Sequence, residues 1–151
     1  MTLEDLLARE AIRHTMALYN NNGDSGNYAN HVNVFHPDAE MVVHQNKILR
    51  GVQEIIAALQ AGAESRGAKE PGNFQRHHLT TSFIELTSPT TGRGRQDIII
   101  VTELGLDHAG MYEDEFTEHE GRWLIKRRQA TMLWARPDSR FVRWLGAPKQ
   151  G

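Results

Sequence analysis

The sequence contains no cysteine, which excludes a disulfide framework, a thiolate metal site and a cysteine nucleophile. It also has no run of about 18 apolar residues, the length that a membrane-spanning helix needs. Residues 1–5 are acidic in character and provide neither the basic stretch nor the apolar run of a signal peptide. We therefore expect neither export nor membrane insertion, and we predict a cytoplasmic location.

A strong charge of either sign is also lacking. Lys and Arg number 17 against 19 for Asp and Glu, and the formal net charge of −2 provides no field for holding a phosphate backbone. Nucleic acid is therefore not an expected partner. A length of 151 residues with 39% hydrophobic content is typical of a single soluble domain. We predict one domain over residues 1–151, with a core at about 3–135 and a C-terminal tail at 136–151.

Helical and strand patterns alternate with turn signals along the chain. Thr2 and Asp5 resemble a capping box at the start of a first helix, which the Asn- and Gly-rich run 20–26 is expected to end. In the second half, residues 88–94 form the longest expected connection, and Glu120-Gly121 is a tight hairpin signal. The expected elements are helices over residues 3–19, from 27 to 34 or 35, and 52–67, and strands over 39–44, 47–49, 74–86, 96–104, 110–118 and 122–134.

This order of elements predicts an α+β fold in which a curved sheet wraps one face around the helices. Such a sheet leaves a concave interior, which becomes a deep pocket where the helices do not fill it. The tail is too apolar to be ignored, since it contains Phe141, Trp144 and Leu145. We expect it to pack on the body of the protein or on a neighbouring chain.

Histidine is the most informative residue type, with eight copies at positions 14, 31, 36, 44, 77, 78, 108 and 119. We interpret His14, His36, His108 and His119 as exposed or locally bonded. His77 and His78 stand at the start of a predicted strand, where successive side chains point to opposite faces. Only one of the two can reach the interior, and the pair cannot chelate one metal ion. No other ligand cluster is evident, so no metal site is predicted.

Alternation places His77 on the more apolar face of its strand, together with Leu79, Thr81 and Phe83. Taken alone, His77 is typical of a structural histidine and Asp24 of a turn or cap residue. Tyr112 alternates with Asp114 and Phe116 on one face of its own strand, which indicates either a pocket wall or ordinary patterning. Spacing alone therefore leaves the functional and the structural interpretations open.

Six motifs in order carry a family resemblance. They are Asp24-Ser25-Gly26-Asn27-Tyr28, Phe35-His36-Pro37-Asp38-Ala39, Arg50-Gly51, Arg76-His77, Gly110-Met111-Tyr112-Glu113-Asp114-Glu115-Phe116, and Gly121-Arg122-Trp123-Leu124-Ile125 running to Arg127-Arg128. This set resembles the SnoaL-like branch of the nuclear transport factor 2-like superfamily over residues 3 to about 135. The resemblance implies a cone-shaped α+β fold, with three N-terminal helices packed in a strongly curved, mixed but mainly antiparallel sheet.

Within that branch the chain is similar to scytalone dehydratase and lindane dehydrochlorinase, in which an aspartate after the first helix pairs with a histidine that opens a long strand. Matched by motif, these are Asp24 and His77. The resemblance implies that His77 is a general acid/base and that Asp24 fixes its tautomer.

Five further residues are expected to bind substrate. Tyr112 and Tyr28 would hold its oxygen, and Thr81 or Arg127 would act likewise. The sequence departs from the pattern at Gly23, where the fungal dehydratase has a tyrosine, and within 97–102, where no second histidine is present. Either His44, on the expected hairpin strand, takes that second role, or the chain has no residue for it.

The resemblance implies a lyase of the dehydratase type, or an isomerase or cyclase, that needs no cofactor. The substrate would be a small hydrophobic ring compound with hydroxyl or keto groups. The same fold also serves non-catalytic ligand-binding or dimerisation modules and small scaffold subunits of ring-hydroxylating dioxygenases. In each case we expect a homodimer or homotrimer.

Overall fold

The computed structural model describes residues 1–68 and 70–142, which form an α+β fold. Its helical elements are α1 (Leu3–Ser25), the 3-10 helices η1 (Tyr28–Asn33) and η2 (His44–Asn46), and α2 (Val52–Ser65). Its strands are β1 (Phe35–Val42), β2 (Ile48–Arg50), β3 (Gln75–Ser88), β4 (Thr91–Thr102), β5 (Gly105–His119) and β6 (Arg122–Ala135).

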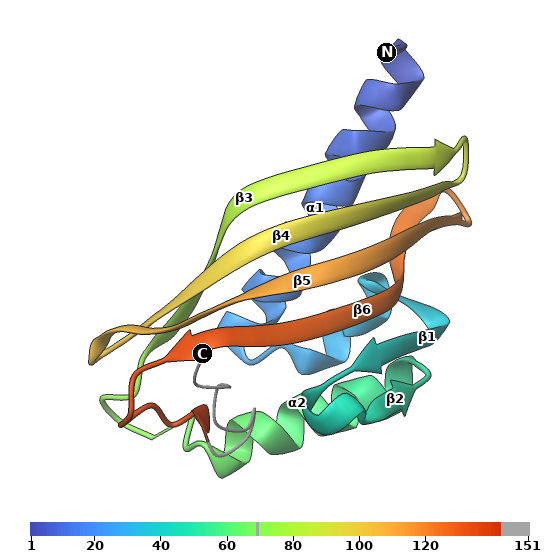
Figure 1. Ribbon diagram of the computed structural model, residues 1–151. Coiled ribbons are helices and arrows are strands. Elements are labelled where there is room, and N and C mark those ends of the chain that lie inside the picture. The colour runs from blue at the N-terminus through green and yellow to red at the C-terminus, as the bar shows by residue number, and fades with distance from the viewer. Residues whose placement is uncertain (69, 143–151) are drawn as a thin grey trace.

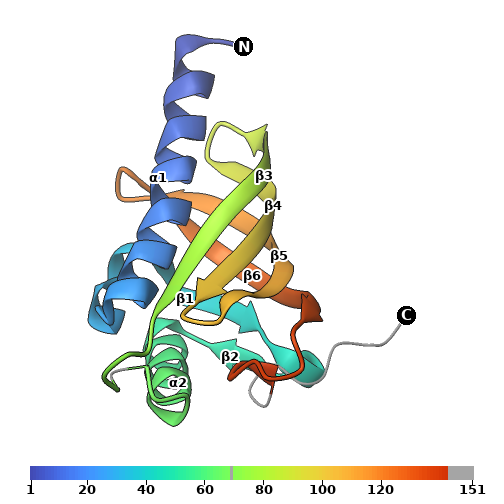
Figure 2. The same cartoon turned by 90° about the vertical axis from the view of Figure 1, so that its left-hand side faces the viewer.

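The six strands form one open sheet in the order β2-β1-β6-β5-β4-β3. All neighbours are antiparallel except β1 and β6, which are parallel. The helices α1 and α2 lie on the same side of this sheet (Figures 1 and 2), where α1 contacts β3 and β6 and α2 contacts β1. The predicted α+β class and mixed, mainly antiparallel sheet are confirmed. In place of the second predicted helix, the chain forms the 3-10 turns of η1.

Helix α1 continues past the point where the sequence predicted its end. Residues 20–25 remain helical, and Gly26 closes the helix in the left-handed conformation at φ 73°. Asn20 and Asn22 are buried, and the Asn22 side chain accepts a hydrogen bond from Asn30 Nδ2 at 3.0 Å. Tertiary contacts therefore outweigh the turn-forming tendency of this run. The prediction that the helix ends before residue 20 is wrong.

Three strands, β1, β4 and β5, also begin earlier than predicted. Strand β1 contains Pro37, where pairing with β6 is irregular between Phe35 and Glu40, because proline has no N–H to donate. Strand β4 includes Gly92 and Gly94, which were predicted to belong to the connection over residues 88–94. A Cβ on Gly94 would lie 3.1 Å from the Phe116 ring, so glycine is needed for packing there and not for a turn. The Glu120-Gly121 turn is confirmed, with φ values of 51° and 77°.

A buried ion pair lies inside the apolar core. Arg128 donates to both carboxylate oxygens of Asp114, at 2.7 and 2.6 Å, and both side chains are almost fully buried. The guanidinium carbon lies 4.2 Å from the centre of the Tyr19 ring and 4.1 Å from that of Tyr112. Burial opposes the charge of Arg128, but the Asp114 carboxylate outweighs this effect and raises the pKa of Arg128. The cation thereby fixes two aromatic rings that belong to different elements.

Replacing Asp114 by Asn should destabilise the fold by about 3–5 kcal/mol, because it leaves a buried guanidinium without its counter-charge. Urea unfolding followed by circular dichroism measures the change. The matched control is Glu113→Gln, which alters an exposed carboxylate on the same strand and should change the free energy of unfolding by less than about 0.5 kcal/mol. Equal stability of the two variants would contradict a structural role for the pair.

Candidate active site

A cavity lies between the helices and the sheet, and together with the open solvent at its mouth it has a volume of about 790 Å³. Its wall combines apolar side chains with three histidines, three tyrosines and one arginine, drawn from all of the long elements. The lining residues are Tyr19, Asn20, Gly23, Tyr28, His31, Met41, Val43, Leu59, Arg66, Gln75, His77, Ile98, His108, Gly110, Tyr112, Ala130, Thr131, Met132 and Phe141.

Asp24 and His77 meet at this cavity. The Asp24 Oδ1 atom lies 2.6 Å from His77 Nδ1, and Oδ2 accepts a hydrogen bond from the His77 backbone N–H at 2.9 Å. The two side chains retain 11% and 17% of their exposure. The carboxylate therefore holds both the ring and the backbone of the histidine.

The folding of α1 and β3 explains this pairing. Because α1 continues to Ser25, Asp24 is presented from its last turn, beside the first residues of β3. Tyr28 supports this end of the helix by donating its hydroxyl hydrogen to the Gly23 carbonyl, at 3.3 Å. An ionised carboxylate against Nδ1 requires a proton on that nitrogen, so the neutral ring of His77 keeps Nε2 as a proton acceptor.

A second imidazole–carboxylate pair lies at the same cavity and was not predicted. His108 lines it from β5, and its Nδ1 atom is 2.7 Å from Asp107 Oδ2. Neighbours in sequence can both point inward because Asp107 is the extra residue of a β-bulge, where the register with β4 shifts. His108 was predicted to be exposed or locally bonded. It is locally bonded, to Asp107, but it is buried, with 3% of its surface exposed. Burial lowers the pKa of His108.

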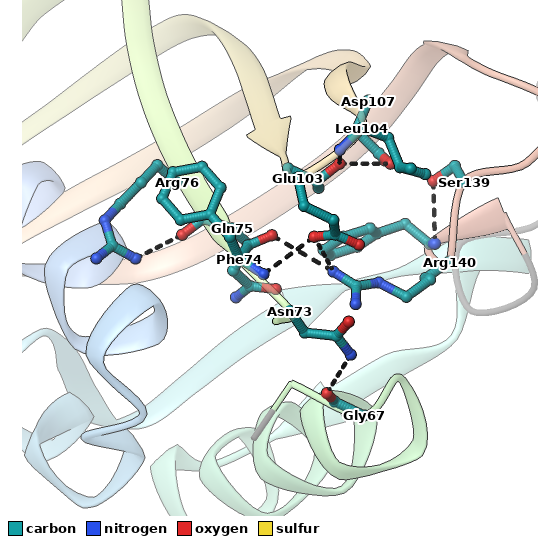
Figure 3. Close-up of polar contacts among 12 residues, drawn as sticks. Gly67, Asn73, Phe74, Gln75, Arg76, Glu103, Leu104, Asp107, Ser139 and Arg140 are labelled. Atoms are coloured by element: carbon teal, nitrogen blue, oxygen red, sulfur yellow. Dashed lines mark hydrogen bonds and ion pairs between the residues drawn. The ribbon is translucent and has the colours of Figure 1, made fainter. Parts of the chain in front are cut away.

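The beginning of the C-terminal tail closes one side of the cavity. Ser139 donates to Asp107 Oδ2 at 2.5 Å, and Phe141 packs its ring against that of His108 at a centroid distance of 4.5 Å. Arg140 lies 3.1 Å from Glu103, which also accepts the Phe74 backbone N–H (Figure 3). Phe141 thus packs on the body, as predicted, while Trp144 and Leu145 lie outside the described residues.

Two of the five predicted substrate-binding residues line the cavity, Tyr112 and Tyr28. Burial raises the pKa of both phenols, and that of Tyr112 well above its usual value. Both hydroxyls therefore stay protonated at neutral pH. The Tyr112 hydroxyl can donate to a ligand oxygen, whereas the Tyr28 hydroxyl already donates to the Gly23 carbonyl.

The other three predicted binding residues lie away from it. Thr81 is exposed, because β3 has an extra residue between Leu79 and Ser82 that reverses the alternation assumed from the sequence. Arg127 lines a groove on the outer face of the sheet, and its neighbour Arg128 points inward. His44 is exposed in η2 and not on a strand. Their predicted placement in the pocket is wrong.

Sequence reasoning also missed His31 and Arg66 as cavity residues. His31 is 1% exposed, its Nδ1 atom is 3.0 Å from the Tyr28 carbonyl oxygen, and burial lowers its pKa. Arg66 follows α2 and stacks its guanidinium over the Phe141 ring at 4.5 Å. Neither residue belongs to a periodic pattern, so no signal in the sequence marks them as cavity residues.

Within residues 1–68 and 70–142, no group of three His, Asp or Glu side chains is placed to hold a metal ion. No helix in the same part of the chain is long and apolar enough to cross a membrane.

Comparison with protein families matches residues 4–129 to the SnoaL-like domain. No curated protein matches the chain. A solved scytalone dehydratase-like protein from Novosphingobium aromaticivorans is 21% identical, covers 100% of this chain and 99% of its own, and has a TM-score of 0.80. A hexachlorocyclohexane dehydrochlorinase, LinA type 2, is 18% identical over 89% and 91% of the two chains, with a TM-score of 0.73.

A third similar structure is Rv3472 of Mycobacterium tuberculosis, a protein of unknown function. It is 19% identical over 85% of this chain and 73% of its own, with a TM-score of 0.72. At these identities the likeness establishes the fold, and the chemistry has to be argued from the cavity itself.

The two buried histidines make stability depend on pH. Burial lowers the folded-state pKa of His31 and His108 below the ordinary value of 6.5, so below that pH the unfolded chain binds more protons. The free energy of unfolding should therefore fall as pH drops from about 6.5, and the loss should be complete below the folded pKa values. Urea unfolding at a series of pH values tests this.

The His31→Gln variant should show a shallower dependence near pH 6, whereas His14→Gln, at an exposed site on α1, should match the wild type. An unfolding free energy that stays constant or rises as the pH is lowered through this range would contradict the account.

Proposed function

The chain belongs to the family of SnoaL-like domains, as its motifs predicted, and from this premise we propose that it is a cofactor-free lyase of the dehydratase type. The substrate proposed is a small hydrophobic ring compound with hydroxyl or keto groups. His77 acts as the general acid/base, and Asp24 orients it.

The observation that carries this proposal is the carboxylate of Asp24 on His77 Nδ1, 2.6 Å away, where His77 lines a cavity with apolar and aromatic walls. General base catalysis requires this geometry, in which one ring nitrogen is held and the other faces the substrate. A histidine that served only the core would not need a place on the cavity wall. The alternative of a non-catalytic ligand-binding module uses the same cavity and assigns the pair a structural role.

The proposed reaction is an elimination in which one residue, His77, both removes the proton and returns it. His77 Nε2 takes a proton from a substrate carbon, and the electron pair of the C–H bond forms the new double bond. The bond from the adjacent carbon to the hydroxyl oxygen breaks, and His77 returns its proton to that oxygen as water leaves. In an isomerase, the same proton would return to another carbon.

Charged groups around His77 favour the intermediate imidazolium. Asp24 is in direct contact with the ring, and the carbonyl end of α1, which carries the negative end of the helix dipole, lies beside it. On the substrate side, the Arg66 guanidinium and the Tyr112 hydroxyl line the same cavity and suit a carbonyl oxygen that gains negative charge.

The similar proteins support an elimination by their names. One is described as a scytalone dehydratase and another as a hexachlorocyclohexane dehydrochlorinase. Both names describe the removal of a hydrogen and a leaving group from a ring. What this chain shares with them is the fold, and the transfer of the reaction class to this cavity is our proposal.

Replacing His77 by Gln should lower kcat/KM by about 10²–10⁴-fold, because it removes the proton acceptor. Two assays measure this: loss of water from a β-hydroxy cyclohexanone, and incorporation of deuterium into β-tetralone in D₂O, which reports carbon deprotonation alone. The matched control is His78→Gln, because His78 is the next residue on β3 and is exposed.

The control should keep the wild-type rate, and both variants should unfold at similar urea concentrations. Wild-type activity in His77→Gln would exclude the proposed base and favour the module that only binds its ligand.

A further inference from the structure

The cavity contains a second imidazole that is held as firmly as His77. The side chains of His108 and Asp107 retain only 4% and 2% of their exposure, so this pair is more deeply buried than the first. Asp107 also accepts the Ser139 hydroxyl at 2.5 Å and lies 3.5 Å from the Thr102 hydroxyl. Three polar groups, from β4, β5 and the tail, thus act together to fix one ring, which core packing alone does not require.

His77 and His108 lie in one row across the sheet. His77 is opposite Ile100 of β4, and Ile100 is opposite His108 of β5. Residues opposite one another point to the same face, and two strand spacings separate the Cα atoms by roughly 10 Å. Both rings line the same cavity. A ligand ring that reaches His77 from within this cavity can therefore have His108 at its other side.

The hydrogen-bonding state of His108 follows from its partners. Asp107 on Nδ1 places the ring proton there, so the neutral ring leaves Nε2 as an acceptor. Within residues 1–68 and 70–142, no hydrogen bond from the protein reaches Nε2. Burial and the charges of His77 and Arg66 disfavour a second proton, whereas Asp107 favours it, and the balance lowers the pKa of His108. At neutral pH His108 Nε2 is thus an acceptor at the cavity that has no hydrogen-bond partner among the described residues.

We propose that His108 is the residue that selects the substrate: its Nε2 atom accepts a hydrogen bond from a hydroxyl group on the ligand ring, opposite the carbon that His77 deprotonates. The ligand class is therefore a ring compound with a hydroxyl donor, and not a ring ketone alone. A ligand that lacks the hydroxyl leaves a buried acceptor without a partner, which costs affinity. The role of His77 in this inference rests on the proposed function. The binding of the hydroxyl group by His108 does not depend on it.

The tail is part of this recognition element. The Ser139 hydroxyl donates a hydrogen bond to Asp107. The Phe141 ring packs against the His108 ring, and the Phe141 backbone N–H donates to the Ser139 hydroxyl at 3.0 Å. Loss of the Ser139 hydroxyl frees one lone pair of the carboxylate and loosens the ring. Ser139 is accordingly a positioning residue, which acts through Asp107 and does not touch the ligand.

The test compares the binding of phenol and fluorobenzene, two rings of similar size of which only phenol has an O–H donor. The wild type should bind phenol about tenfold more tightly than fluorobenzene at neutral pH. In nitrogen NMR spectra of the wild type, the His108 Nε2 signal should shift with phenol and stay unchanged with fluorobenzene. This readout requires no variant and no turnover, so it is independent of whether His77 is a base.

Two variants sharpen the assignment. His108→Phe removes the acceptor and should bring the two affinities within about twofold of each other, and His108→Gln, whose amide oxygen accepts a hydrogen bond, should restore much of the preference. His78→Phe, the exposed control, should keep the wild-type ratio.

An unchanged phenol preference in His108→Phe, a wild-type His108 signal that does not respond to phenol, or equal binding of both rings by the wild type would each overturn the proposal. Phenol selectivity together with an active His77→Gln enzyme would refute the proposed base and leave the hydroxyl recognition by His108 in place.

Discussion

A single carboxylate, that of Asp24, joins the end of α1 to the beginning of β3. One of its oxygens holds the His77 ring and the other holds the His77 backbone, so the helix, the strand and the imidazole have fixed positions relative to one another. Everything proposed about reactivity depends on this double contact. Without it the ring could rotate or change tautomer, and Nε2 would no longer be presented to the cavity as an acceptor.

Charged groups behind the cavity wall hold several of its side chains in place. The Arg128 guanidinium contacts the rings of both Tyr19 and Tyr112, and Asp114 neutralises its charge within the core. Asp24 and Asp107 act in the same way for the two histidines. In each case a buried ionic group carries no chemistry itself but fixes a side chain that faces the ligand, which is the arrangement that precise binding sites require.

The sequence predicts the α+β class and the sheet from its periodic apolar patterns. The Asp24–His77 pair was predicted from the resemblance of its ordered motifs to the SnoaL-like branch. Prediction from the sequence fails where tertiary contacts determine the length of a helix or the direction of a side chain. The burial of Asn22 and its hydrogen bond from Asn30 extend α1 through a run that resembles a turn. The bulge near Thr81 moves that residue outside, and the bulge at Asp107 brings His108 inside. A bulge changes which residues face the cavity without altering composition or period, so alternation alone cannot place them.

The tautomer of His77 tests the central claim most directly, since the claim is that Asp24 keeps the proton on Nδ1. Nitrogen NMR of the wild type at a pH where the ring is neutral should show Nδ1 protonated and Nε2 bare, and Asp24→Asn should lose that strong preference while the exposed His78 is unaffected. A wild-type ring protonated on Nε2, or a tautomer balance that the Asp24→Asn substitution leaves unchanged, would contradict the account.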